Sequence, residues 1–190
     1  MATVQPDIHY LACIGLMGSG KSTIGRMLAE RLGWAFVDVD DTIEATTGST
    51  VAELWERGGE ERYRPLERKV VIDVLRATEH VVLATPGGVV LDREASNAIA
   101  APDVAAVYLR ATPATLAARI AGDTGHKRPL VDDQPAAVMR AMFEARDRSY
   151  EHLADHVVQV DELTPDQAAI AVHHLLIGSV LRPDPADAER

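Results

Sequence analysis

Short apolar runs alternate along the chain with longer segments of helical periodicity. The apolar runs lie at residues 10–14, 35–40, 80–84, 104–109 and 156–160, and the second of them ends in acidic residues. Apolar runs of this length are typical of strands buried on both faces, as in a parallel sheet that helices cover on each side. The pattern therefore predicts an α/β fold built on one parallel sheet.

The segments between these runs predict helices. They cover residues 23–32, 42–47, 51–56, 59–77, 113–121, 135–153 and 164–176. Gly33 is the predicted C-terminal cap of the first helix, because glycine readily adopts the left-handed conformation that ends many helices. Thr164 followed by Pro165 marks the start of the last helix.

The remaining segments set the predicted domain boundaries. Residues 122–134 are polar and rich in glycine, proline and aspartate, which predicts a mobile loop. We expect one domain over residues 1–181, since a chain of this length suits a single core. Residues 182–190 combine charged residues with proline and alanine, and they predict a disordered tail.

A phosphate-binding motif follows the first apolar run. Residues 15–22 read Gly-Leu-Met-Gly-Ser-Gly-Lys-Ser and lead directly into the first predicted helix. In this context the motif binds phosphate through backbone N–H groups and the positive end of the helix. Lys21 is expected to reach the β- and γ-phosphates, and the Ser22 hydroxyl to bind Mg²⁺. The alternative is a glycine-rich turn without a ligand. The predicted nucleotide-binding residues of the loop are Gly18, Ser19, Gly20, Lys21, Ser22 and Thr23.

Composition narrows the class of protein. The chain has 190 residues, 47% of them hydrophobic, and its single cysteine, Cys13, excludes a disulfide framework. No apolar stretch approaches the ~20 residues that span a membrane, and residues 1–8 lack the pattern of a signal peptide, so we expect a cytoplasmic protein. The formal net charge of −10 argues against nucleic acid as a partner. An anionic ligand must then be held by local arginines and backbone amides.

Acidic residues and glycines follow two of the predicted strands. Asp38 and Asp40 end the second strand two residues apart, so we expect their side chains on the same side of that strand. Gly87 and Gly88 follow the third strand, and ligands of open parallel sheets bind beyond the carboxyl ends of the strands. One carboxylate could hold Mg²⁺ while the other orients a substrate hydroxyl. The alternative is a helix N-cap with a solvated neighbour.

Several motifs in order resemble those of the shikimate kinases. The loop alone indicates only a nucleoside triphosphatase, whereas the combination of Asp-x-Asp, Gly-Glu-x-x-Tyr-Arg and Arg-Pro-Leu is specific to that family. These motifs, with the further matches, lie at residues 15–23, 38–40, 43–44, 47–54, 59–67, 87–88, 127–130 and 146–150. The matched region spans roughly residues 10–165.

The resemblance implies a fold and a reaction. The expected architecture is a three-layer α/β/α P-loop kinase with a five-stranded parallel sheet in the order 2-3-1-4-5. The expected activity is transfer of the γ-phosphoryl of ATP to the 3-hydroxyl of shikimate, on the route to chorismate and the aromatic amino acids. The resemblance further implies substrate-binding helices at about residues 41–77, a lid at about 119–134, and Mg²⁺ with ATP. We also expect a monomer that binds neither nucleic acid nor membrane.

The resemblance also implies roles for individual residues. Arg64 and Arg146 match arginines that hold the shikimate carboxylate, and Arg119 falls near an arginine that lies over adenine. The other implied roles are metal binding for Ser22 and Asp38, substrate binding for Asp40, Gly87 and Gly88, phosphate binding by Arg128 of the lid, and catalysis by Lys21, Asp40 and Arg128.

Departures from the family pattern leave two alternatives open. Pro86 stands where the family has the first of three glycines, and it predicts a different turn because proline has no N–H. The first alternative is a P-loop kinase of another carboxylated polyol, such as gluconate, or of a cyclitol. The second is a nucleotide-binding protein without turnover.

Overall fold

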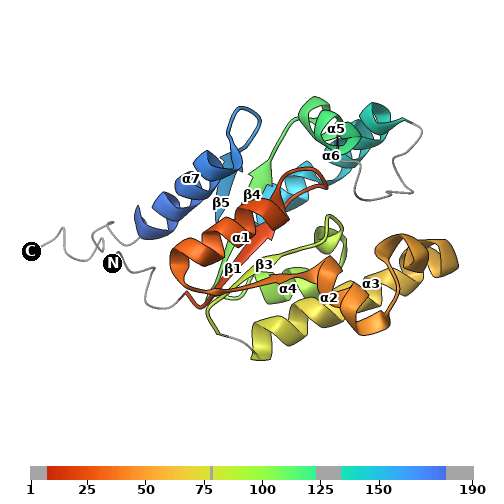
Figure 1. The fold of residues 1–190 in the computed structure, drawn as a ribbon, viewed down its shortest axis with the longest axis horizontal. Coiled ribbons are helices and arrows are strands. Elements are labelled where there is room, and N and C mark those ends of the chain that lie inside the picture. The colour runs from red at the N-terminus through yellow and green to blue at the C-terminus, as the bar shows by residue number, and fades with distance from the viewer. Residues whose placement is uncertain (1–7, 78, 123–133, 179–190) are drawn as a thin grey trace, which may run out of the picture.

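A parallel sheet of five strands forms the centre of the molecule (Figure 1). The computed structural model describes residues 8–77, 79–122 and 134–178. The strands are β1 (Tyr10–Ile14), β2 (Ala35–Asp38), β3 (Val81–Ala84), β4 (Val104–Arg110) and β5 (His156–Gln159), in the order β2-β3-β1-β4-β5. All neighbouring strands pair in parallel, so the expected fold class and strand order are confirmed.

The helices connect the strands and cover both faces of the sheet. They are α1 (Lys21–Leu32), α2 (Val39–Thr47), α3 (Val51–Ala77), α4 (Arg93–Ile99), α5 (Pro113–Gly122), α6 (Pro135–Leu153) and α7 (Pro165–Gly178), with a short 3₁₀ helix η1 (Val89–Leu91). Helices α1 and α7 pack side by side on one face, and α4 and α6 pack against β4 from the other. The pairs α2–α3 and α5–α6 flank the right side of the sheet in Figure 1.

The core lies in the three central strands. Every residue of β1 and β3 is buried, as are all residues of β4 except its last. The edge strands β2 and β5 keep mostly partly exposed residues, because each has a neighbour on one side alone. This distribution explains why the central strands are continuous apolar runs in the sequence. In the described part of the chain no helix is both long and apolar enough to cross a membrane.

Three regions of the chain differ from the sequence-based expectation. The predicted helices at 51–56 and 59–77 form one element, α3, which is kinked at Gly59 (φ 56°, ψ −154°). Strand β2 ends at Asp38, and α2 begins three residues earlier than predicted. The sequence analysis missed α4, which has only seven residues, and the preceding η1. The predicted tail 182–190 and most of the predicted loop 122–134 lie outside the described residues.

Helix α4 depends on its N-terminal cap. The Asp92 carboxylate accepts hydrogen bonds from the backbone N–H groups of Glu94 and Ala95, both at 3.0 Å, and it also pairs with Arg68 at 3.3 Å. We expect Asp92→Ala to lower the free energy of unfolding by about 1 kcal/mol, the usual effect of losing such a cap. Urea denaturation measures this change.

Asp92→Asn is the matched variant, because asparagine caps helices as well as aspartate does but cannot pair with Arg68. We expect Asp92→Asn to retain most of the stability that Asp92→Ala loses. Equal losses in the two variants would show that the ion pair, rather than the cap, stabilises α4.

Candidate active site

The phosphate-binding loop joins β1 to α1 at the carboxyl edge of the sheet. Gly15, Gly18 and Gly20 all have positive φ values, of 141°, 80° and 94°. A Cβ on Gly15 would lie 2.8 Å from the carbonyl oxygen of Leu109, so the loop packs directly against the end of β4. The Ser19 hydroxyl is buried and has no hydrogen-bond partner among the described residues. The loop therefore has the closed backbone curve that an anion requires.

Lys21 and Ser22 begin α1 directly after this loop. The Lys21 ammonium reaches back across the loop and donates a hydrogen bond to the Leu16 carbonyl at 2.9 Å. Ser22 is exposed in the first turn of the helix, where the N-terminal dipole favours negative charge. Both side chains thus lie at the place where the sequence predicts phosphate and a metal ion.

The sequence analysis expected Asp38 and Asp40 to lie on one strand, but in the structure they do not. Asp38 is the N-cap of α2, and its Oδ1 accepts a hydrogen bond from the Asp40 N–H at 3.0 Å. Asp40 belongs to the first turn of that helix. The expectation of two side chains on one side of a strand is therefore wrong, because the Asp38 carboxylate satisfies a free N–H and starts the helix there.

Asp40 is nevertheless a partly buried carboxylate, not a solvated neighbour of the cap. It accepts a short hydrogen bond from the Tyr63 hydroxyl of α3. Burial raises the pKa of Asp40 above its ordinary value, and the negative charge of Asp38 adds to this, whereas the Tyr63 hydrogen bond and Lys21 lower the pKa. Asp40 thus lies close enough to Lys21 for the two charges to interact, and it has a raised proton affinity.

The oxygen atoms at this edge suit a magnesium ion. The Ser22 hydroxyl and the Asp38 carboxylate are hard oxygen donors, which Mg²⁺ prefers. Within the described ranges, no three His, Cys, Asp or Glu residues form a cluster that could hold a metal by themselves. Mg²⁺ usually binds through one or two protein ligands together with substrate phosphates, and the donor set fits that mode.

Arg64 lies directly over Gly88 in the turn that follows β3. A Cβ on Gly88 would clash with Nη1 of Arg64, so any side chain at this position requires the guanidinium to move. The Arg64 guanidinium donates to Glu67 at 2.6 Å through Nη1, and to Glu60 at 2.8 and 2.6 Å through Nε and Nη2. It also lies 5.7 Å from the centre of the Trp55 ring. These contacts fix the guanidinium in one orientation.

Glu60 and Glu67 are functional candidates that the sequence analysis did not single out. They lie four residues before and three residues after Arg64, which is the spacing of ion pairs on one helix face. Burial raises the pKa of Glu67 to about 7, although the nearby Arg64 opposes this shift. Glu60 remains half exposed. The sequence spacing was the available signal, but the same spacing is common on solvated helices.

Arg146 and Tyr150 of α6 contact Gly87, which precedes Gly88 in the turn after β3. Nη1 of Arg146 donates to the Gly87 carbonyl at 3.1 Å, and the Tyr150 hydroxyl donates a short hydrogen bond to the same oxygen. Burial raises the pKa of Tyr150, so its hydroxyl stays protonated and remains a donor. Gly87 in turn lies against the phosphate-binding loop, since a Cβ there would be 3.4 Å from the Met17 N atom.

Pro86 fits this turn without loss of a hydrogen bond in the sheet. The neighbouring Thr85 N–H makes its bond to the Cys13 carbonyl at 3.1 Å, before the chain leaves the sheet. The Pro86 carbonyl then accepts from the Val89 N–H at 3.2 Å, which closes the turn around Gly87 and Gly88. The altered residue is thus accommodated where its missing N–H does not interrupt the ladder.

Arg119 of α5 lies at the other side of the phosphate-binding loop. It donates to the Val160 carbonyl at 2.6 Å and to the Gly18 carbonyl at 3.4 Å. It therefore links the loop to the chain that leaves β5. Arg128, predicted to reach the phosphates from the lid, lies outside the described residues.

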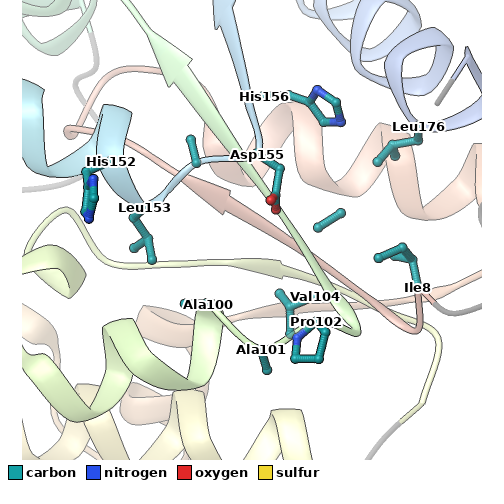
Figure 2. Close-up of a pocket in the computed structure, with 12 residues that line it drawn as sticks. Ile8, Ala100, Ala101, Pro102, Val104, His152, Leu153, Asp155, His156 and Leu176 are labelled. Atoms are coloured by element: carbon teal, nitrogen blue, oxygen red, sulfur yellow. The ribbon is translucent and has the colours of Figure 1, made fainter. Parts of the chain in front are cut away.

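A separate cavity of about 480 Å³ lies at the opposite end of the strands (Figure 2). Its walls include Ile8 before β1, Val104 at the start of β4 and His156 at the start of β5. The Asp155 carboxylate at its edge is bound to the Ala106 N–H at 2.8 Å. This cavity is far from the carboxyl edge where parallel sheets bind ligands, and the predicted site residues do not line it.

Comparison with known proteins agrees with this geometry. The family model for shikimate kinase matches residues 17–176. The shikimate kinase of Aliivibrio fischeri is 41% identical over 165 residues, which cover 86% of this chain and 91% of that protein. The chain belongs to the shikimate kinase family. It is thus an ATP-dependent kinase, a phosphotransferase with an alcohol acceptor.

Solved structures separate the family from its alternatives. A structure of the shikimate kinase of Acinetobacter baumannii in complex with shikimate matches with a TM-score of 0.85 and 28% identity, over 92% of this chain and 96% of that one. A gluconokinase of Sinorhizobium meliloti matches with a TM-score of 0.56 and 16% identity, over 95% of this chain and all of that one. The second likeness shows the shared fold alone, so the shikimate kinase interpretation is favoured over a gluconate kinase.

The close approach of Arg64 to Gly88 gives a test of the substrate side of this shikimate kinase. We expect Gly88→Ala to raise the KM for shikimate by at least about tenfold, because the added methyl group must displace a charged donor whose loss costs ~1.5–3 kcal/mol. Nucleotide affinity should change little. Steady-state kinetics with each substrate varied in turn measures both.

The control is a double-mutant cycle with Arg64→Ala. If Gly88→Ala acts by displacing Arg64, the double variant should be no worse than Arg64→Ala alone. Additive losses would mean that Gly88 acts through some other contact.

Proposed function

We propose that this chain binds shikimate with its carboxylate between Arg64 and Arg146, and presents the 3-hydroxyl to the γ-phosphate of ATP held by residues 18–23. The observation that carries the proposal is the meeting of α3 and α6 at Gly87 and Gly88, beside the phosphate-binding loop. Two guanidinium groups and two side-chain-free residues thus adjoin the place of phosphate binding.

The two arginines suit a carboxylate for a geometric reason. A guanidinium group presents parallel N–H donors that match the two oxygens of a carboxylate, which an ammonium group cannot do. Glu60 and Glu67 hold Arg64 in place, and the Gly87 carbonyl does the same for Arg146. A substrate carboxylate would then meet donors that are already oriented.

Asp40 is proposed to orient the substrate hydroxyl and to accept its proton late in the reaction. Phosphoryl transfer passes through a loose transition state, so positioning and charge neutralisation matter more than early proton removal. A carboxylate with a raised pKa, held by Tyr63 at the start of α2, suits that late role.

The nucleotide side is proposed to use residues that surround the phosphate-binding loop. Gly18, Ser19, Gly20 and Thr23 would offer backbone N–H groups to the phosphates, with Lys21 and Arg128 as cations, and Arg119 would lie by adenine. Ser22 and Asp38 would hold Mg²⁺, which neutralises phosphate charge when bound. The family resemblance alone supports the role of Arg128.

We further propose that the enzyme works as a cytoplasmic monomer. Its proposed ligands are the small molecules ATP and shikimate. ATP is available in the cytoplasm, which supports that location.

The two arginines give a direct test of the substrate orientation. We expect Arg64→Lys and Arg146→Lys each to raise the KM for shikimate by about tenfold, equivalent to 1.4 kcal/mol, because the forked contact with the carboxylate is lost. The KM for ATP should stay within about twofold, since neither guanidinium group is proposed to contact the nucleotide. A coupled assay for ADP release measures both constants.

Arg68→Lys is the matched control, because Arg68 lies on the same helix but pairs with Asp92, the N-cap of α4, and contacts neither Gly87 nor Gly88 in the described contacts. It should leave both KM values unchanged. If Arg64→Lys or Arg146→Lys raised the KM for ATP alone, the assignment of these arginines to the substrate side would be wrong.

The choice of acceptor is tested by the same assay with shikimate, quinate and gluconate. We expect efficient turnover with shikimate alone. The acceptor must place its carboxylate between the two arginines and, at the same time, its hydroxyl between Asp40 and the ATP held by the phosphate-binding loop. Comparable kcat/KM for gluconate would overturn the proposed acceptor.

A further inference from the structure

An ion pair between the end of β4 and helix α6 involves the residue that directly follows Arg146 of the proposed carboxylate site. Asp147 of α6 accepts hydrogen bonds from Nε of Arg110 at 2.9 Å and from the Tyr108 hydroxyl at 2.9 Å. Its second oxygen accepts from Nη2 of the same arginine at 2.5 Å. The Asp147 side chain is only 14% exposed. This is a two-pronged arginine–carboxylate contact with a third donor, which is among the stronger polar arrangements in proteins.

We propose that Asp147 is a positioning residue for the kinase reaction, because its contact with Arg110 sets the rotation of α6 that brings Arg146 to the substrate turn. The proposal rests on the proposed role of Arg146 in binding the shikimate carboxylate. Asp147 itself contacts neither the substrate turn nor the phosphate-binding loop in the described contacts.

The spacing along α6 supports this role. Phe143, Asp147 and Glu151 are four residues apart and form one stripe of the helix. All three contact Arg110, with the Phe143 ring centre at 5.4 Å from the guanidinium carbon and Glu151 at 3.4 Å. One arginine at the end of a central strand thus contacts three successive turns of the helix, which fixes the helix in both rotation and axial position.

The adjacent stripe of the same helix carries the substrate-side contacts. Arg146 and Tyr150 are also four residues apart, and both donate to the Gly87 carbonyl. Because a helix turns as a rigid body, a rotation that loosens the Asp147 stripe moves the Arg146 stripe by the same angle. The two stripes are therefore coupled by geometry.

Tyr108 connects the two stripes a second time. Its hydroxyl donates to Asp147, and its ring stacks on the Tyr150 ring with centres 4.9 Å apart and planes at 25°. Tyr108 also pairs in the sheet with Ile14, the residue just before the phosphate-binding loop. The Arg110–Asp147 contact thus fixes α6 relative to the same strands that hold that loop.

The test compares Asp147→Asn with a control substitution at Asp155, which also connects the α6 segment to β4 but at a different place. Asp155 follows α6 and binds the Ala106 N–H of β4, at the opposite end of that strand. We expect Asp147→Asn to raise the KM for shikimate about tenfold with little change in the KM for ATP, because small displacements of binding groups can cost up to ~100-fold. Asp155→Asn should lower the melting temperature and leave both KM values unchanged.

Charge reversal tests whether the pair acts through its geometry. The variant with Arg110→Asp and Asp147→Arg together should recover most of the shikimate affinity that either single change loses. If Asp147→Asn fails to fold, Arg110→Lys replaces it, since lysine keeps the charge but cannot make the forked contact; it should raise the same KM by a smaller factor.

The outcomes separate this proposal from the proposed function. If Arg146→Lys raises the KM for shikimate but Asp147→Asn only lowers the melting temperature, Asp147 is merely structural and the inference is overturned. If Arg146→Lys itself leaves that KM unchanged, the proposed role of Arg146 fails. A rise for Asp147→Asn with recovery in the reversed pair supports the positioning role.

Discussion

The turn after β3 is the constraint on which the proposed substrate side of the molecule depends. Gly88 leaves room for the Arg64 guanidinium at a distance that no Cβ could tolerate, and the Gly87 carbonyl accepts hydrogen bonds from Arg146 and Tyr150. Two helices far apart in the sequence are thus fixed to adjacent residues. A Cβ at Gly88 would displace the Arg64 guanidinium, and a Cβ at Gly87 would lie 3.4 Å from the backbone of the phosphate-binding loop.

The parallel sheet explains why these parts meet. Strands β3, β1 and β4 are neighbours, so the turn after β3, the loop after β1 and the Arg110 end of β4 lie at one edge. Connections in such a sheet return through helices, which places α3 before one of these strands and α6 after another. The same topology leaves the cavity of Figure 2 at the opposite edge, away from the reacting groups.

The sequence predicted the positions of the strands well, because buried central strands are continuous apolar runs. The order of the strands in the sheet followed from the family resemblance and not from these runs. It missed α4, whose seven residues are too few for a clear helical period, although Asp92 was an available cap signal. It placed Asp40 on a strand because a cap and a strand end use the same residue types. The contacts of Asp147 with Arg110 could not be predicted, since they join residues 37 positions apart, and acidic residues such as Asp147 are common on solvated helices.

The electrostatic design of the site follows from its acidic surroundings. The chain carries a formal net charge of −10, yet its family acts on anionic nucleotides. Long-range repulsion is weak beyond the Debye length of about 8 Å at physiological salt, so donors in contact with the ligand decide binding. Those donors must not move when charge develops, because reorientation would consume the stabilisation that they provide. In the proposed site, the carboxylates that hold Arg64 and Arg110 would therefore assist binding even though they add negative charge, since they would fix the donors directly or through α6.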